Sequence, residues 1–258
     1  MPRPFAAMFF ALVTTAATIP VRAVDYERIL LPILIKPFAG AFETSWRVDA
    51  QMLIDSNEAL EMFPLVDCVL CVERMPRGSA FQPPLFFQQP NHPPGSMLYV
   101  ERSVADDVRI SVRLRETTRG TAAGLEMPVV REREFFTDTI HILDVPIRSG
   151  SRVTLRIYDV DARAGSAARI RFLSPTQTVP AATFDAPFVR SPAHNPNFSL
   201  NVTPAYIQVS GVEENFPQLN ALDRIRIEID PLTTGLTFWA FISITDDLTQ
   251  QVSLITPQ

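Results

Sequence analysis

Apolar and polar residues alternate with a period of two along much of the chain. The alternation is clearest in four segments, at residues 46–54, 108–115, 153–158 and 225–230. Successive side chains of a strand point to opposite faces, so this pattern predicts strands with one apolar and one polar face. No stretch of twelve or more residues has a helical period, and only residues 216–223 suit a single helical turn. The pattern predicts an all-β protein with antiparallel sheets that keep one face wet.

The segment from Leu236 to Thr245 departs from this pattern because it carries bulky groups on both faces. The expected core face consists of Leu236, Phe238, Ala240, Ile242 and Ile244. Trp239 and Phe241 therefore point the other way, beside threonine and serine hydroxyls. These two rings are our candidate binding residues, because exposed aromatic rings on a polar strand face can stack on sugars. The alternative is burial against a second β unit, which also explains a strand that is apolar on both faces.

The chain contains an internal repeat. The strand–turn–strand at residues 224–247 has a weaker copy at residues 95–116. Upstream of each copy, a short apolar segment leads into an alternating one: "LPIL" precedes "WRVDAQMLID" in the first half, and "MPVV" precedes "FFTDTIHILD" in the second. This alignment sets Trp46 against Phe135 without a gap. We interpret the two halves as tandem antiparallel β-sandwich units related by this repeat.

The boundary between the two units is predicted near residues 117–126. This stretch holds two of the nine glycines and almost no bulky apolar residues. Such a composition is typical of a connection between elements rather than of a strand. The predicted units are therefore residues 24–122 and residues 123–258, and both lengths are usual for one domain.

The first 23 residues have the pattern of a secretory signal peptide. A basic start with Arg3 precedes an apolar run of 15 residues, and the small residue Ala23 stands at the expected cleavage position. A membrane anchor is the alternative, but a span needs about 20 apolar residues, and Pro20 and Arg22 interrupt the run. We expect a mature chain that begins at Val24 and is exported to the periplasm, the cell surface or the medium, without a membrane span.

Three stretches carry a resemblance to a known group of proteins. They are the opening "LPIL…WRVDAQMLIDS", the strand "RVTLRIYDVDAR" and the ending "FWAFISITDDLTQQVSLITPQ". In these the chain resembles uncharacterised exported bacterial proteins built from tandem Ig-like β-sandwich units. The resemblance implies an Ig-like fold and an exported location. It carries no catalytic residue across to this sequence.

Charge narrows the range of partners. The formal charge is −5, and loss of the signal would remove two arginines and no acidic residue, which leaves −7. Nucleic acids and anionic membranes bind basic patches, so neither is an expected partner. The partner is otherwise unknown, and an envelope glycan or an envelope protein is our expectation.

Cys68 and Cys71 are the two cysteines of the chain. In an exported protein the usual fate of such a pair is a disulfide. If the segment were a straight strand, however, the two Cα atoms would lie roughly 10 Å apart, beyond the reach of a bridge. A disulfide therefore requires a bend, which Pro64 and the "MPRG" that follows would favour. No surrounding βαβ pattern suggests a redox site, and no further ligands with zinc spacing are present.

Other candidate chemistry is sparse. The three histidines are His92, His141 and His194. The sequence contains no Gly-x-Ser-x-Gly motif that would support a hydrolase triad with any of them. Asp159 with Asp161 and Asp246 with Asp247 have the spacing of solvated turn residues. "DVDARAG" begins like a calcium loop, but Arg163 occupies a ligand position and the distal glutamate is missing. We therefore expect no catalytic residue, no metal ligand and no cofactor.

These expectations together favour an exported, non-catalytic binding or structural module of the cell surface or periplasm. One alternative is a carbohydrate-binding module that uses Trp239 and Phe241. A less favoured alternative is a divergent β-sandwich hydrolase with an Asp/Glu pair in a cleft of a sheet face.

Overall fold

The computed structural model of the chain describes nine ranges of residues. They are 25–33, 38–39, 43–55, 60–63, 73–75, 80–81, 95–118, 124–190 and 203–258. The predicted signal peptide and the cysteines Cys68 and Cys71 lie outside these ranges. The cleavage site and the disulfide therefore stay predictions.

The described strands form four sheets, and every strand pair among them is antiparallel, which confirms the all-β class. Two sheets belong to the first half of the chain. Sheet A has the order β10 (Val130–Arg131), β1 (Tyr26–Leu31), β7 (Ser96–Glu101), β4 (Leu60–Phe63) and β5 (Glu73–Met75). Sheet B has the order β2 (Phe38–Ala39), β3 (Ser45–Ile54), β8 (Val108–Glu116) and β9 (Leu125–Met127), and β6 (Ala80–Phe81) also pairs with β3.

The second half contributes the other two sheets. Sheet C has the order β15 (Ala205–Ser210), β12 (Ser151–Asp159), β17 (Phe238–Asp246) and β18 (Val252–Ile255). Sheet D has the order β11 (Ile140–Pro146), β16 (Arg224–Pro231), β13 (Ala167–Leu173) and β14 (Ala182–Pro187). The helical elements are short: η1 (Arg102–Asp107), η2 (Glu132–Glu134), α1 (Val212–Asn215) and η3 (Pro217–Ala221). The last of them confirms the helical turn predicted within residues 216–223.

Apart from β2 and β10, which have no counterpart among the described strands, the two halves have the same strand order. In the first half, β1, β4, β5 and β7 lie in sheet A, and β3, β6, β8 and β9 lie in sheet B. In the second half, β11, β13, β14 and β16 occupy the same places in sheet D, and β12, β15, β17 and β18 occupy them in sheet C. Sheet A thus corresponds to sheet D, and sheet B corresponds to sheet C. In particular, β3 with β8 matches β12 with β17.

This correspondence corrects two details of the sequence interpretation. The duplicated strand–turn–strand suggests a hairpin from its sequence, but β7 lies in sheet A and β8 in sheet B, and β16 and β17 are divided between sheets D and C in the same way. The alignment of Trp46 with Phe135 is also wrong, because Trp46 opens the β3–β8 ladder and Ser151 opens the β12–β17 ladder. Alternation alone cannot distinguish two strands of similar pattern; their pairing partners do.

The strands of the first two sheets extend to β10, and the boundary between the two units stays a prediction. β9 pairs with β8 and β10 pairs with β1, so residues 125–131 belong to the sheets of the first half. β8 ends at Glu116 and β9 begins at Leu125, so the stretch near residues 117–126 lies largely between these two strands in the chain. The first half of the fold comprises β1 to β10, and the second half comprises β11 to β18.

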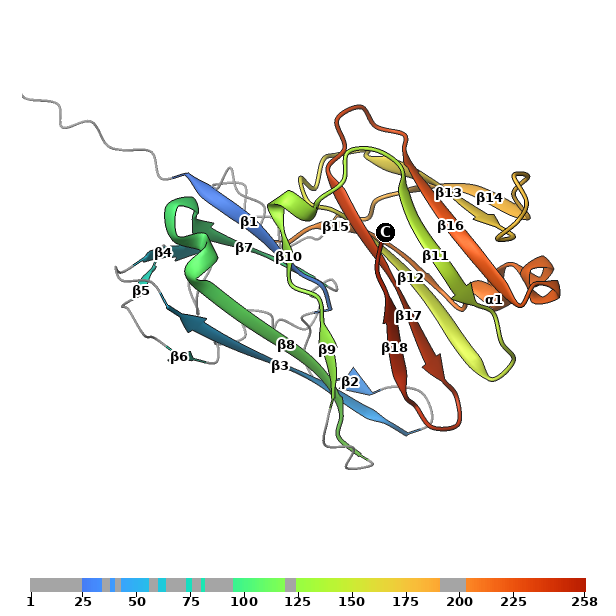
Figure 1. The fold of residues 1–258 in the computed structure, drawn as a ribbon, viewed down its shortest axis with the longest axis horizontal. Coiled ribbons are helices and arrows are strands. Elements are labelled where there is room, and N and C mark those ends of the chain that lie inside the picture. The colour runs from blue at the N-terminus through green and yellow to red at the C-terminus, as the bar shows by residue number, and fades with distance from the viewer. Residues whose placement is uncertain are drawn as a thin grey trace, which may run out of the picture.

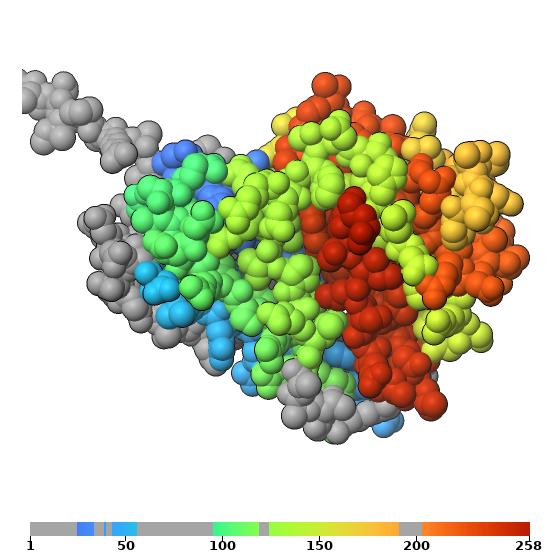
Figure 2. Space-filling view, in the orientation of Figure 1, coloured from blue at the N-terminus to red at the C-terminus, as the bar shows by residue number. Residues whose placement is uncertain are grey.

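The described residues form two apolar cores. Sheets C and D enclose the second core, which includes Ile142, Ile227 and Ile242. The first core contains residues of sheets A and B, and it also takes in Tyr158, Val160, Trp239 and Phe241 from the second half. Sheet C is the layer of the second half that lies next to the first half, and sheet D is farther away (Figure 1). The chain between β9 and β11 runs across the junction in light green (Figure 2).

No helix in the described part of the chain has the length and hydropathy that crossing a bilayer requires.

Candidate functional site

The candidate binding residues Trp239 and Phe241 lie at the junction of the two halves. Their relative exposures are 4% and 0%, and both belong to the first core. Phe241 stacks on Tyr158 with ring centroids 6.3 Å apart, and Trp239 lies 5.6 Å from Phe241. The sugar-stacking hypothesis for these two rings is therefore wrong, because neither ring offers a face to a ligand. The alternative interpretation, burial against the other β unit, is the one that the packing shows.

The register of sheet C explains this burial. Tyr158 of β12 lies between Tyr206 of β15 and Trp239 of β17, so three aromatic side chains form one row on the outer face. Directly opposite residues of a sheet share a face, and this row faces the first half. The predicted division of β17 is confirmed, because Phe238 and Ile242 lie in the second core while the two alternate aromatic residues lie in the first.

The first half meets this surface with the outer face of sheet A. Arg28 and Leu30 share one face of β1, and they lie opposite Tyr99 and Met97 of β7. Leu30 and Met97 are fully buried. Arg28 reaches Asp161 in the second half, so this face of sheet A points toward the second half. The junction is thus built from sheet A on one side and sheet C on the other.

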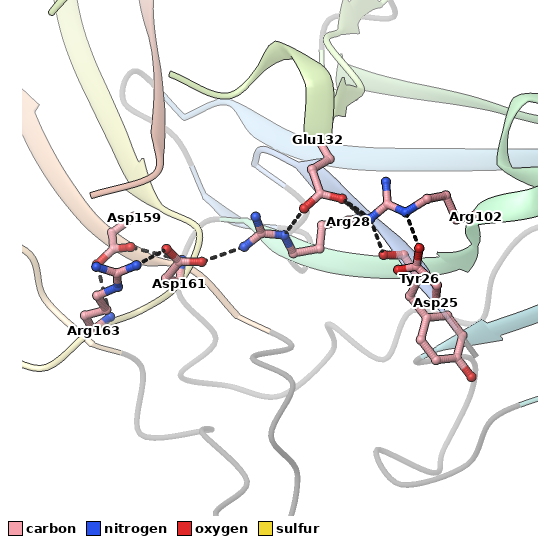
Figure 3. Close-up of polar contacts among 8 residues, drawn as sticks. All are labelled: Asp25, Tyr26, Arg28, Arg102, Glu132, Asp159, Asp161 and Arg163. Atoms are coloured by element: carbon pink, nitrogen blue, oxygen red, sulfur yellow. Dashed lines mark hydrogen bonds and ion pairs between the residues drawn. The ribbon is translucent and has the colours of Figure 1, made fainter. Parts of the chain in front are cut away.

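An ion-pair network crosses the polar part of this junction (Figure 3). The guanidinium of Arg28 donates from Nε to Glu132 Oε1 over 2.7 Å and from Nη1 to Asp161 Oδ1 over 2.5 Å. Its Cζ lies 5.7 Å from the centre of the Phe135 ring. Arg28 therefore connects three segments: β1, the η2 segment between the halves, and the turn after β12.

Glu132 receives a second arginine on its other side. Arg102 donates from Nη2 to Glu132 Oε2 over 2.7 Å and from Nε to Asp25 Oδ2 over 2.9 Å. Burial alone would raise the pKa of Glu132, but the hydrogen bonds from Arg102 and Arg28 outweigh it and lower that pKa below its usual value. Glu132 is therefore held as a carboxylate between two cations (Figure 3).

Asp159 shapes the turn that presents Asp161. Its carboxylate accepts the backbone N–H groups of Asp161, Ala162 and Arg163 and the hydroxyl of Ser166. Burial raises the pKa of Asp159, although these hydrogen bonds act in the opposite direction. Asp161 in turn accepts Arg28 and Arg163. The two carboxylates are thus occupied by protein donors and do not form the calcium loop that their spacing suggested.

The other sequence candidates lie apart from the junction. Asp246 closes its own turn by accepting the N–H groups of Leu248 and Thr249, and Asp247 pairs with Arg152. His141 is exposed on the outer face of sheet D, 3.9 Å from Glu228. His92 and His194 lie outside the described ranges. Within those ranges, no group of three or more His, Cys, Asp or Glu side chains is arranged to hold a metal ion.

Sequence reasoning missed the residues that join the halves. Arg28 is 104 residues from Glu132 and 133 residues from Asp161. Arginine is abundant in this chain, so a lone arginine on a strand carries no signal of such a partner. The sole indication available was the double-sided apolar pattern of residues 236–245, which predicted that something covers β17.

Comparison with known proteins adds no relative. No protein-family model matches the chain, and neither a curated protein nor a solved structure is detectably similar to it.

Proposed function

We propose that this protein is an exported, non-catalytic binding or structural module, built from two Ig-like β-sandwich units related by an internal duplication. The shared strand order of the two halves supports the duplication. The signal-peptide pattern of the first 23 residues supports export. The partner is an envelope glycan or an envelope protein.

The junction is the single observation that carries this proposal. Tyr158, Trp239 and Phe241 are buried against the first half, and Arg28 adds an ion pair to Asp161 across the same contact. Contacts between domains in one chain are commonly small and polar, so relative motion is the usual expectation. An apolar junction with a crossing ion pair instead holds the outer surfaces of both halves in one orientation. Such an arrangement suits a module that presents surfaces to a partner.

A pull-down tests the proposal. The mature chain from Val24 is immobilised and exposed to envelope and culture-supernatant fractions, with glycan and protein pools kept separate. Specific retention from either pool supports a binding module and identifies its class of partner. If the folded chain retains nothing beyond a heat-unfolded control, the proposed function is wrong.

A variant with an opened junction refines the test. Trp239→Ala should loosen the contact between the halves without touching an exposed surface, since the ring is buried. If the partner contacts both halves, retention should fall with this variant. Unchanged retention would show that one half binds alone and would contradict the role proposed for the fixed orientation.

A further inference from the structure

Arg156 occupies the middle of the outer face of sheet C. It lies on β12 between Gln208 of β15 and Phe241 of β17. Its Nε donates to Gln208 Oε1 over 3.2 Å, and its Nη1 donates to Ser243 Oγ over 2.9 Å. Its Cζ lies 5.7 Å from the centre of the Phe241 ring. The guanidinium is therefore held in place by neutral groups alone.

No described carboxylate pairs with Arg156, and this sets it apart. Among the arginines whose side chains the structure describes, the others that lack an ion pair are exposed: Arg113, Arg148 and Arg190. Arg156 is instead partly buried, and burial lowers its pKa. Removing a cation from water without a counter-charge is unfavourable. An anion that reached this guanidinium would remove that penalty.

The donors of Arg156 are also suitably placed for an anion. Nη2 donates to no described residue, and the neighbouring Gln208 and Ser210 are exposed on the same face. A guanidinium presents pairs of N–H groups that match the two oxygens of a carboxylate. Phe241 and Ser243 support the group from β17, so the cation is fixed rather than swinging freely, and less side-chain entropy is lost when it binds.

Neutral polar side chains continue from Arg156 along the same face. Ser210, Thr154 and Ser243 form the next row of the sheet, and Gln208 donates to Ser210 Oγ over 2.9 Å. Hydroxyl and amide groups of this kind exchange hydrogen bonds with sugar hydroxyls. A ligand that combines one carboxylate with several hydroxyls matches both features.

We propose that Arg156 binds the carboxylate of an acidic sugar of the uronate class, with Gln208, Ser210 and Thr154 facing the sugar hydroxyls. This inference rests on the proposed binding function and narrows its partner to an acidic glycan. The site is separate from the buried rings of Trp239 and Tyr158. These rings form the adjacent row on the other side of Arg156 from Thr154 and Ser243.

Titration of the mature chain with glucuronate tests the site, with glucose and acetate as matched probes. Glucuronate should bind, glucose should bind at least about tenfold more weakly for want of the charge, and acetate should also bind more weakly for want of the hydroxyls. Arg156→Met should weaken glucuronate binding by about tenfold or more, since a charged hydrogen bond is lost. Arg113→Met removes the same charge from an exposed position on β8 and should leave the dissociation constant unchanged.

Each contrary result has a defined meaning. Equal binding of acetate and glucuronate would show that the site recognises a carboxylate alone, such as that of a protein, and would overturn the glycan assignment. No saturable glucuronate binding, or equal effects of the two arginine variants, would overturn the site. If Arg156→Met does not fold, the comparison of the three probes on the unaltered chain decides alone. If glucuronate fails to bind while the pull-down retains a partner, the Arg156 site is wrong but the proposed function stands.

Discussion

Strands β8 and β17 hold the same place in the two halves, yet their outer faces are opposite in character. Both strands have nine residues and pair along their whole length, so Arg109 corresponds to Trp239 and Leu53 corresponds to Tyr158. Leu53 is 40% exposed beside Arg109, whereas Tyr158 is fully buried beside Trp239. The same position in the fold is therefore wet in one half and dry in the other.

Sheets A and D show the reverse. β7 is buried on both faces, with Met97 and Tyr99 on its outer side. Its counterpart β16 has an outer face on which Glu228 and Asp230 pair with Arg171 of β13. The halves meet through sheet A of one and sheet C of the other, which are not counterparts (Figure 1). The parts of these two sheets that lie in the contact are therefore apolar on both faces, whereas Gln208 and Ser210 of sheet C remain exposed. The pattern of apolar and polar residues in a strand depends on what packs against its two faces, and not on the strand's place in the sheet order.

The largest expected effect on the free energy of unfolding comes from truncating the buried side chain of β17, with its exposed counterpart on β8 as the comparison. Trp239→Ala should lower the free energy of unfolding by about 3–5 kcal/mol, because it leaves a cavity in a packed core. Arg109→Ala should change it by less than about 0.5 kcal/mol, because the side chain is exposed. Denaturant unfolding of both variants measures the difference. Similar losses at the two positions would contradict the assigned burial.

A double-mutant cycle across the junction should give the next largest effect. Arg28→Met and Asp161→Asn should show a coupling of about 1–3 kcal/mol, since the pair is partly desolvated and hydrogen-bonded. Arg169→Met and Asp185→Asn form the matched cycle on the outer face of sheet D. Exposed pairs couple weakly, so this second value should be smaller. If the coupling at the junction is no larger than that of the exposed pair, the Arg28–Asp161 ion pair does not contribute specially to the contact between the halves.

The smallest expected effect is on the free energy of unfolding at acidic pH. The lowered pKa of Glu132 means that its contribution to stability is complete above its ordinary value of 4.5 and is lost as the pH falls through the folded-state pKa. Glu132→Gln should therefore reduce the loss of stability in this acidic range. Unfolding free energies measured as a function of pH, from neutral to about pH 3, test this.

Asp185→Asn is the control for that measurement. Arg169 lowers the pKa of Asp185 on the exposed face, so its contribution should have the same sign but should be largely abolished by added salt. The effect of Glu132, which lies between two arginines at the junction, should persist in salt. Equal salt sensitivity at both sites would show that the junction network is as open to solvent as the surface pair.

Local patterns predicted much of the fold but not the site. The alternation of Ile225, Ile227 and Ile229 with polar residues correctly predicted one apolar and one polar face for β16, but the polar face is not fully wet, since Glu228 is 8% exposed. The helical turn at η3 and the two faces of β17 were also predicted correctly. The alignment of Trp46 with Phe135 failed because both segments alternate, and alternation carries no record of the pairing partner.

The sequence by itself determined the strands and which side chains share a face, because the two-residue period is a local property of the extended backbone. The tertiary structure alone decided what lies across each face. It placed Arg28 against an aspartate 133 residues away, buried Trp239 where a sugar platform was conceivable, and left Arg156 without a carboxylate. These outcomes depend on how the sheets of two halves stack. The double-sided apolar pattern of residues 236–245 indicates that this strand is covered on both faces, but a local pattern does not identify the distant segment that covers it.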